Sequence, residues 1–185
     1  MKKTVMGAIV GGLLIFIWQT LSWTVLHLHE PSQQYHPKQD TILSFLSANI
    51  EKEGGYLMPT VPMNTPMAEA QKMGEKMQGK PWVQVQYHKT FDIDGKAMIN
   101  NMVRGLLANI IMVALLIWVF SKMGKQSFFT TLIATLLIGV IVFTNAPYTS
   151  HIWYPMFDIK AHLTDALLSW GLCGIWLGWW LNRGK

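Results

Sequence analysis

Four long apolar runs constrain the fold of this chain more than any other feature of its sequence. They cover residues 5–26, 103–120, 128–143 and 163–181. A helix of about 20 apolar residues crosses a hydrocarbon core roughly 30 Å thick. Charged residues occur in these runs only near their ends, at Arg104 and Asp165, where burial costs less than at a helix centre. The sequence therefore predicts a mainly α-helical integral membrane protein, built on a bundle of four transmembrane helices.

Basic flanks without acidic residues lie on one side of the runs only. Their basic residues are Lys2, Lys3, Lys122, Lys125, Arg183 and Lys185, whereas all ten acidic residues lie in the segments 27–102 and 144–165. Cytoplasmic flanks of membrane helices collect Lys and Arg. We therefore predict a multi-pass protein with both termini in the cytoplasm (N-in/C-in). The lone cysteine and the lack of an N-glycosylation acceptor are consistent with a bacterial cytoplasmic (inner) membrane.

This division explains the formal net charge of +5, because the basic excess lies in the cytoplasmic flanks. Such flanks contact anionic lipid headgroups, so membrane lipids are expected partners and nucleic acid is not. The predicted segments are transmembrane helices at 5–26, 103–121, 127–144 and 161–182, an extracytoplasmic domain at 27–102 and an external loop at 145–160.

The segment between the first two spans has the periodicity of a small α+β periplasmic domain. An apolar stripe after Asp40 predicts a helix that ends at Gly54-Gly55, followed by a short strand at 56–58. Thr65-Pro66 is typical of a helix start, and the alternation over 83–87 predicts a second strand. The second membrane helix is expected to begin near Lys96.

Small residues four apart indicate where the helices pack. Gly7 and Gly11 lie in the cytoplasmic half of the first span, and Gly174 and Gly178 lie at the same depth in the fourth. Such spacing lets helix backbones approach closely in lipid. We predict that helices one and four meet through these glycines; homodimerisation through the same motif is the alternative.

Polar residues mark the opposite, outer half. Asp158, His162 and Asp165 follow a single helical stripe, and Arg104 of the second span is the expected ion-pair partner of Asp165. This candidate outer polar cluster is interpreted either as structural contacts between helices or as a cavity for an ion or ligand.

Histidines on the same side form a second candidate site. His27, His29, His151 and His162 could hold zinc or copper, because imidazole and carboxylate ligate both metals. The spacing matches no metal-binding motif, so hydrated helix ends are the alternative interpretation. Methionines 63, 67, 73 and 77 could hold Cu(I), but their spacing favours packing of a helix face. No cofactor is predicted, and copper or zinc is the exception considered.

A family resemblance rests on several segments in a fixed order. GGLLIFIW in the first span is followed by TILSFLSANI, then GGYLMP, then WVQVQYH before the second span. In this order the chain resembles an uncharacterised family of small four-helix bacterial inner-membrane proteins with one external domain after the first helix. The resemblance implies that topology and carries no activity or site residues.

Motifs of catalysis are missing from the sequence, which contains no G-x-S-x-G and no phosphate-binding loop. We therefore expect a non-enzymatic protein. The favoured role is an accessory, assembly or interaction subunit of a larger membrane complex, with other membrane-protein subunits as partners. The alternative is an outward-facing metal- or small-ligand-binding membrane protein.

Overall fold

The computed structural model describes residues 2–183, which fall into two compact units. Unit 1 combines Met1–Gln34 with Asp94–Lys185, and unit 2 is Tyr35–Ile93. The chain is mainly helical, as predicted, and its one sheet among the described residues has two strands.

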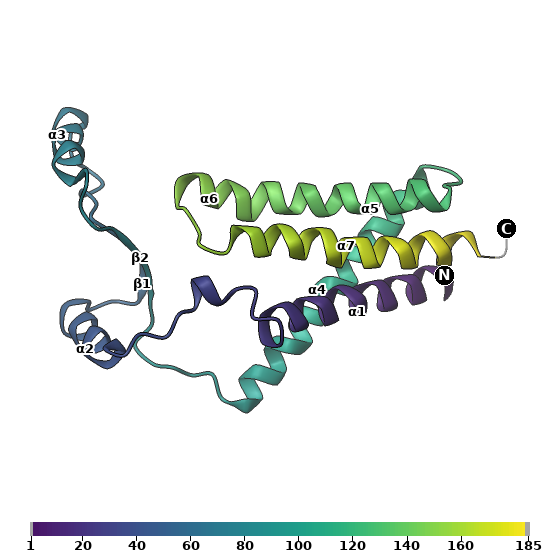
Figure 1. Cartoon of the computed structure of the whole chain (residues 1–185), viewed down its shortest axis with the longest axis horizontal. Coiled ribbons are helices and arrows are strands. Elements are labelled where there is room, and N and C mark those ends of the chain that lie inside the picture. Colours follow the sequence, from purple (N-terminus) through teal and green to yellow (C-terminus); the bar gives the residue numbers. More distant parts are fainter. Residues whose placement is uncertain (1, 184–185) are drawn as a thin grey trace. The chain divides into compact units, whose positions relative to one another are not determined.

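Unit 1 contains four long helices in the order α4, α1, α7, α5, each packed against the next (Figure 1). The elements are α1 (Lys2–Thr24), the 3-10 turn η1 (Glu30–Ser32), α4 (Gly95–Lys122), α5 (Phe128–Phe143), the π-turn η2 (Thr144–Tyr148), α6 (Thr149–Trp153) and α7 (Ile159–Asn182). Side-chain caps set two of the helix starts. Asp94 accepts from the amide of Ala97 at 2.7 Å, and Ser127 accepts from that of Thr130 at 3.1 Å.

Three helices of the described chain have the length and apolar composition of a membrane span. They are Lys2–Thr24, Gly95–Lys122 and the continuous helix Phe128–Trp153. The prediction of membrane-length apolar helices is confirmed for these three. The fourth predicted span, residues 161–182, forms most of α7, a helix of 24 residues that is not among the three.

The predicted external loop at 145–160 is wrong for its first half. The chain stays helical from α5 through η2 and α6 to Trp153, and only residues 154–158 connect it to α7. Pro147 has no amide hydrogen to donate, and the wider π-turn around it lets the helix continue. The hydroxyl of Thr149 donates to the carbonyl of Thr144 at 2.8 Å within this turn.

The core of unit 1 lies where α1, α4 and α7 meet. Ile15, Val113 and Leu177, one from each helix, are fully buried there. In α5, the side chains of Thr131 and Thr135 are buried. Their hydroxyls donate to backbone carbonyls one turn earlier along the chain. These internal hydrogen bonds let hydroxyls pack between helices without an unsatisfied donor.

Close approach of α1 to its neighbours depends on glycine. A Cβ at Gly12 would lie 2.7 Å from backbone atoms of Ile110 in α4. Gly7 faces Trp180 of α7 and Gly11 faces Cys173, as the predicted packing of helices one and four requires, and both also face α4, through Ile117 and Val113. The other half of that prediction is wrong.

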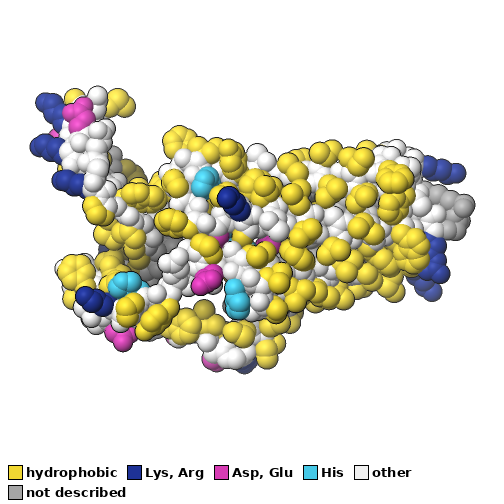
Figure 2. All heavy atoms as spheres, in the orientation of Figure 1, with side chains coloured by type: hydrophobic (Ala, Val, Ile, Leu, Met, Phe, Trp, Pro, Cys, Tyr) yellow, Lys and Arg dark blue, Asp and Glu magenta, His cyan; other side chains and the backbone are white. Residues whose placement is uncertain are grey.

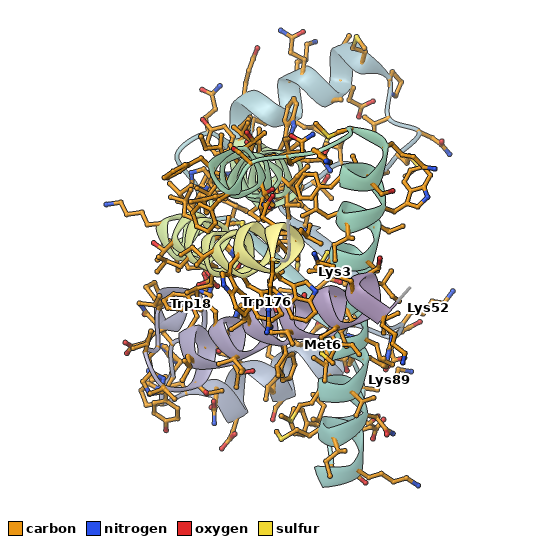
Figure 3. All side chains as sticks on the ribbon, turned by 90° about the vertical axis from the view of Figure 1, so that its right-hand side faces the viewer. Lys3, Met6, Trp18, Lys52, Lys89 and Trp176 are labelled. Carbon is orange, nitrogen blue, oxygen red and sulfur yellow. The ribbon has the colours of Figure 1, made fainter. Side chains whose placement is uncertain are left out.

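Gly174 and Gly178 pack against α5 rather than α1. A Cβ at Gly174 would meet Leu132 and Thr135, and one at Gly178 would meet Phe128. Indole rings cover the α1 side instead. Trp176 donates to the carbonyl of Gly7 at 3.2 Å and Trp180 to that of Lys3 at 2.7 Å. Figure 3 shows Trp176 between α7 and α1. These bonds bring the start of α1 beside the end of α7.

Unit 2 consists of α2 (Gln39–Asn49), β1 (Gly54–Met58), α3 (Met67–Met77) and β2 (Val83–Tyr87). The strands pair antiparallel, with Gly54 opposite Tyr87 and Met58 opposite Val83. Neither helix contains a buried residue, and Met63 and Met67 are largely exposed. Met73 and Met77 are partly buried, so the predicted packing face includes these two methionines but not Met63 or Met67.

Candidate metal centre

Four ionisable side chains come together in unit 1 from two parts of the chain. Asp158 immediately precedes α7, and His162 and Asp165 follow it on one face of that helix. The fourth, His29, lies in the segment that follows α1. The structure thus joins three residues of the predicted outer polar cluster to one histidine of the predicted metal set.

A sharp reversal of the chain after α1 brings His29 to α7. The helix ends at Thr24, and His27 adopts the left-handed conformation with φ 50°. The amide of Leu28 then donates back to the carbonyl of Ser22 at 3.0 Å. Histidine is among the few non-glycine residues enriched in this conformation. The reversal directs His29, two residues after His27, back toward the bundle, where it is only 1% exposed.

His29 is held on both ring nitrogens. Its Nδ1 lies 2.8 Å from Oδ2 of Asp158, and its Nε2 lies 3.0 Å from Oδ2 of Asp165. The indole of Trp23 stacks on the imidazole at a centroid distance of 3.8 Å and an interplanar angle of 5°. Position and orientation of the imidazole are therefore both determined by its neighbours.

Asp165 has a second partner that orients its carboxylate. The indole N–H of Trp18 donates to Oδ1 of Asp165 at 3.0 Å, while Oδ2 faces His29. Trp18 projects from the α1 side of this contact (Figure 3). Both oxygens of Asp165 are thus engaged by groups of the segment that includes α1 and the reversal.

The two hydrogen bonds of His29 determine the charge of this trio. Each of these hydrogen bonds needs one proton, which is carried either by the imidazole or by a carboxyl group. An imidazolium between two carboxylates has a net charge of −1, and so has a neutral imidazole between one carboxylate and one carboxylic acid. Asp158, His29 and Asp165 together therefore carry one negative charge in either arrangement.

His162 lies at the edge of the trio. Its Nε2 is 3.5 Å from Oδ2 of Asp158, and its ring meets that of His29 edge-on at a centroid distance of 4.7 Å. The side chain of His162 is 23% exposed, compared with 1% for His29. It is the one member of the group that solvent reaches readily.

Asp158 combines burial with an unused oxygen. Burial raises the pKa of its carboxyl, but the hydrogen bond from His29, the hydroxyl of Ser32 and the charge of His162 together lower it by more, so the net pKa lies below the usual value. The group is therefore a carboxylate at neutral pH. Its Oδ1 is buried, and although the hydroxyl of Ser32 is near this carboxylate, no described group donates to Oδ1 with hydrogen-bond geometry.

Three of these side chains have the arrangement of a metal site. His29, Asp158 and His162 each offer a ligand atom, and the three atoms lie within 4.8 Å of one another. Imidazole nitrogen and carboxylate oxygen are ligands shared by zinc, copper, nickel and iron. The arrangement can bind a cation with the protein supplying three ligands.

The other predicted site residues lie elsewhere. Arg104 is exposed, and no ion pair joins it to Asp165 within residues 2–183, so the predicted ion pair is wrong. The carboxylate of Asp165 is instead hydrogen-bonded to Trp18 and His29. His27 is exposed, and the ring of His151 accepts from the amide of Met156 at 2.9 Å. Neither contributes to the group. Trp18 was missed, although it shares a helix face with Ser22 one turn later.

No protein-family model, no curated protein and no solved structure matches the chain. The resemblance to small four-helix inner-membrane proteins therefore stays a prediction, and the functional argument depends on the geometry.

Proposed function

We propose that this chain is an integral protein of the bacterial inner membrane that crosses it four times, with both termini in the cytoplasm. Two observations support a crossing by α7. It packs between α1 and α5, which belong to helices of membrane length, and its 24 residues extend about 36 Å. A helix held between two spanning helices crosses the membrane with them.

The charges support the proposed orientation. Lys and Arg side chains gather at the end of unit 1 that carries both termini (Figure 2). The indole bond from Trp180 to Lys3 joins the start of α1 to the end of α7 at this level. Helix α4 ends at Lys122, and the link from α4 to α5 contains Lys125. This link is therefore also basic. A common basic side is what the positive-inside rule associates with the cytoplasm.

Cysteine labelling tests this topology. Cys173, the only cysteine, is buried, so engineered cysteines should react against a low background. We expect a membrane-impermeant maleimide to label Gln78→Cys of unit 2 on intact cells, and Lys125→Cys only after the membrane is permeabilised. Both positions are exposed, which makes them a matched pair. Labelling of Lys125→Cys on intact cells would contradict the orientation.

For the function, we propose that the protein binds a cation at the non-cytoplasmic end of unit 1. One observation carries this proposal: the trio of buried His29, buried Asp158 and partly buried Asp165 has a net negative charge and no Lys or Arg partner in the described chain. A charge inside a bundle of membrane helices normally has a partner. A bound cation would supply that partner.

This proposal accounts for more of the structure than the other two interpretations. Structural contacts between helices would explain the hydrogen bonds of His29, but not the net charge or the unused oxygen of Asp158. An accessory role in a larger complex is motivated by exposed apolar helix faces, which contact with lipid already explains. The cation-binding proposal is therefore preferred.

Thermal unfolding of the purified protein in the presence of different cations tests it. A ligand that binds only the folded state stabilises by about 2.7 kcal/mol at 100 times its dissociation constant. We expect at least one cation among Na⁺, Ca²⁺, Zn²⁺ and Cu²⁺ to raise the melting temperature at constant ionic strength. Asp158→Asn should abolish this increase.

Asp40→Asn is the control, because it removes one exposed acid from unit 2 and should leave the increase unchanged. If no cation raises the melting temperature of the wild-type protein, the proposed function is refuted.

A further inference from the structure

We infer that the cation is a divalent transition metal of the zinc class, bound by His29, Asp158 and His162, with Asp165 and Trp18 orienting His29 from outside the ligand shell. This inference rests on the proposed function and specifies both its ligand and the part each residue has in holding it. The argument uses distances, ligand chemistry and the unused carboxylate oxygen.

The distances are close to those of a tetrahedral site. With metal–ligand bonds of about 2.0–2.1 Å, neighbouring ligand atoms of a tetrahedral zinc ion lie about 3.3 Å apart. Nε2 of His162 is already 3.5 Å from Oδ2 of Asp158, and Nδ1 of His29 is 2.8 Å from it. The widest separation in the group is within 4.8 Å. A small rotation of His162, whose side chain is partly exposed, closes the shell.

The ligand types select the metal class. Two imidazole nitrogens and one carboxylate oxygen suit zinc, copper, nickel or iron. Calcium and magnesium instead prefer shells composed of oxygen, with six or more ligands for calcium. Two neutral donors and one carboxylate at this position therefore discriminate against Na⁺, Mg²⁺ and Ca²⁺. Zinc is taken as the reference ion of this class, because it binds in a compact tetrahedral shell and has no redox chemistry of its own.

Asp165 and Trp18 complete the description as positioning residues. In protein zinc sites, a ligating histidine almost always donates its other N–H to a carboxylate, a carbonyl or water, which selects the tautomer. Here Nε2 of His29 faces Asp165 at 3.0 Å, and Trp18 donates to the other oxygen of that carboxylate. Nδ1 is thereby directed toward Asp158 and the metal. A chain of indole, carboxylate and imidazole thus continues outward from the shell.

Asp158 supplies the second, independent indication of a ligand. Its Oδ1 is buried without a partner, and an unpaired buried oxygen of a carboxylate is costly. A metal ion bound by both oxygens, or a water on the metal that donates to Oδ1, would satisfy it. With three protein ligands, the fourth position of a tetrahedral shell stays open to water on the side of the exposed His162.

Equilibrium zinc binding to the full-length protein in detergent, measured by competition with a zinc indicator, tests the inference. We expect one zinc ion per chain. His162→Ala should weaken binding by more than about 100-fold, because it removes a ligand. Its side chain is partly exposed, so the variant should fold, which an unchanged melting temperature without metal would verify.

Asp165 variants separate positioning from ligation. Asp165→Asn keeps an oxygen that accepts from Nε2 of His29, and should weaken zinc binding by about 10-fold. Asp165→Leu removes the acceptor and should weaken it by about 100-fold. The control is His27→Asn, which removes an exposed imidazole two residues from His29 and should bind zinc like the wild type.

The outcomes distinguish this inference from the proposed function. Stabilisation by Na⁺ or Ca²⁺ without zinc binding would overturn the inference and leave the cation-binding proposal standing. Zinc binding that is unchanged in His162→Ala would also overturn the inference, because the ligands would lie elsewhere. No stabilisation by any cation would refute both.

Discussion

His29→Ala is expected to lower the free energy of unfolding by about 3–5 kcal/mol, the largest effect of any single substitution outside the hydrophobic core. The imidazole is 1% exposed and is hydrogen-bonded to both Asp158 and Asp165. Its removal leaves a buried and a partly buried carboxylate near one another without the protons that lie between them. Chemical or thermal unfolding in detergent, in the presence of a chelator, measures this cost without a contribution from metal.

A double-mutant cycle makes the result specific to the trio. In His29→Ala/Asp165→Ala, one of the two orphaned carboxylates is removed as well, so the double variant should be more stable than the sum of the single effects implies. His27→Asn should change stability by less than about 0.5 kcal/mol, as is usual for exposed positions. A His29→Ala variant as stable as the wild type would show that the buried trio contributes nothing to the fold.

Gly12→Val has the second-largest expected effect. Even a Cβ at this position would lie 2.7 Å from both the N and the Cα of Ile110, so backbone rather than a side chain blocks it. The helices α1 and α4 must separate to admit valine, which loses the contacts of fully buried Ile15 and Val113. We expect a loss of about 1–3 kcal/mol or more in the free energy of unfolding.

Gly105→Ala is the matched control on the partner helix. The nearest atom to its Cβ would be a ring carbon of Phe16 at 3.6 Å, an ordinary contact. Alanine also favours the helix over glycine by about 0.5–1 kcal/mol, so this variant should be as stable as the wild type or more so. Equal stabilities for Gly12→Val and Gly105→Ala would contradict the close approach of α1 and α4.

Features with local causes were predictable from the sequence. The helices and strands of unit 2 follow from glycine, proline and the alternation of apolar residues, and β2 covers the predicted strand. The predicted start of α4 near Lys96 is one residue from the observed start at Gly95, because the Asp94 cap is a local signal. Apolar composition likewise indicated three helices of membrane length.

The loop at 145–160 was mispredicted because a local rule was overridden. Proline normally ends a helix by removing a donor and crowding the preceding turn. Around Pro147 the turn widens instead, and the hydroxyl of Thr149 donates to the carbonyl of Thr144 within it. Sequence offers no signal that separates a proline in a π-turn from a proline in a loop.

The site was predictable on one side only. Helical periodicity places Asp158, His162 and Asp165 in one stripe, and it equally places Arg104 on a neighbouring helix. The choice of His29 over Arg104 depends on the reversal at His27, a single left-handed residue with no periodic signature.

The zinc X-ray absorption spectrum of the loaded protein is the sharpest test of the metal site, because it reports the ligand atoms themselves. We expect a shell of nitrogen and oxygen at about 2.0–2.1 Å, with the outer scattering of two imidazoles, and of one imidazole in His162→Ala. A sulfur neighbour at about 2.3 Å, or a shell of oxygen without imidazole, would contradict it.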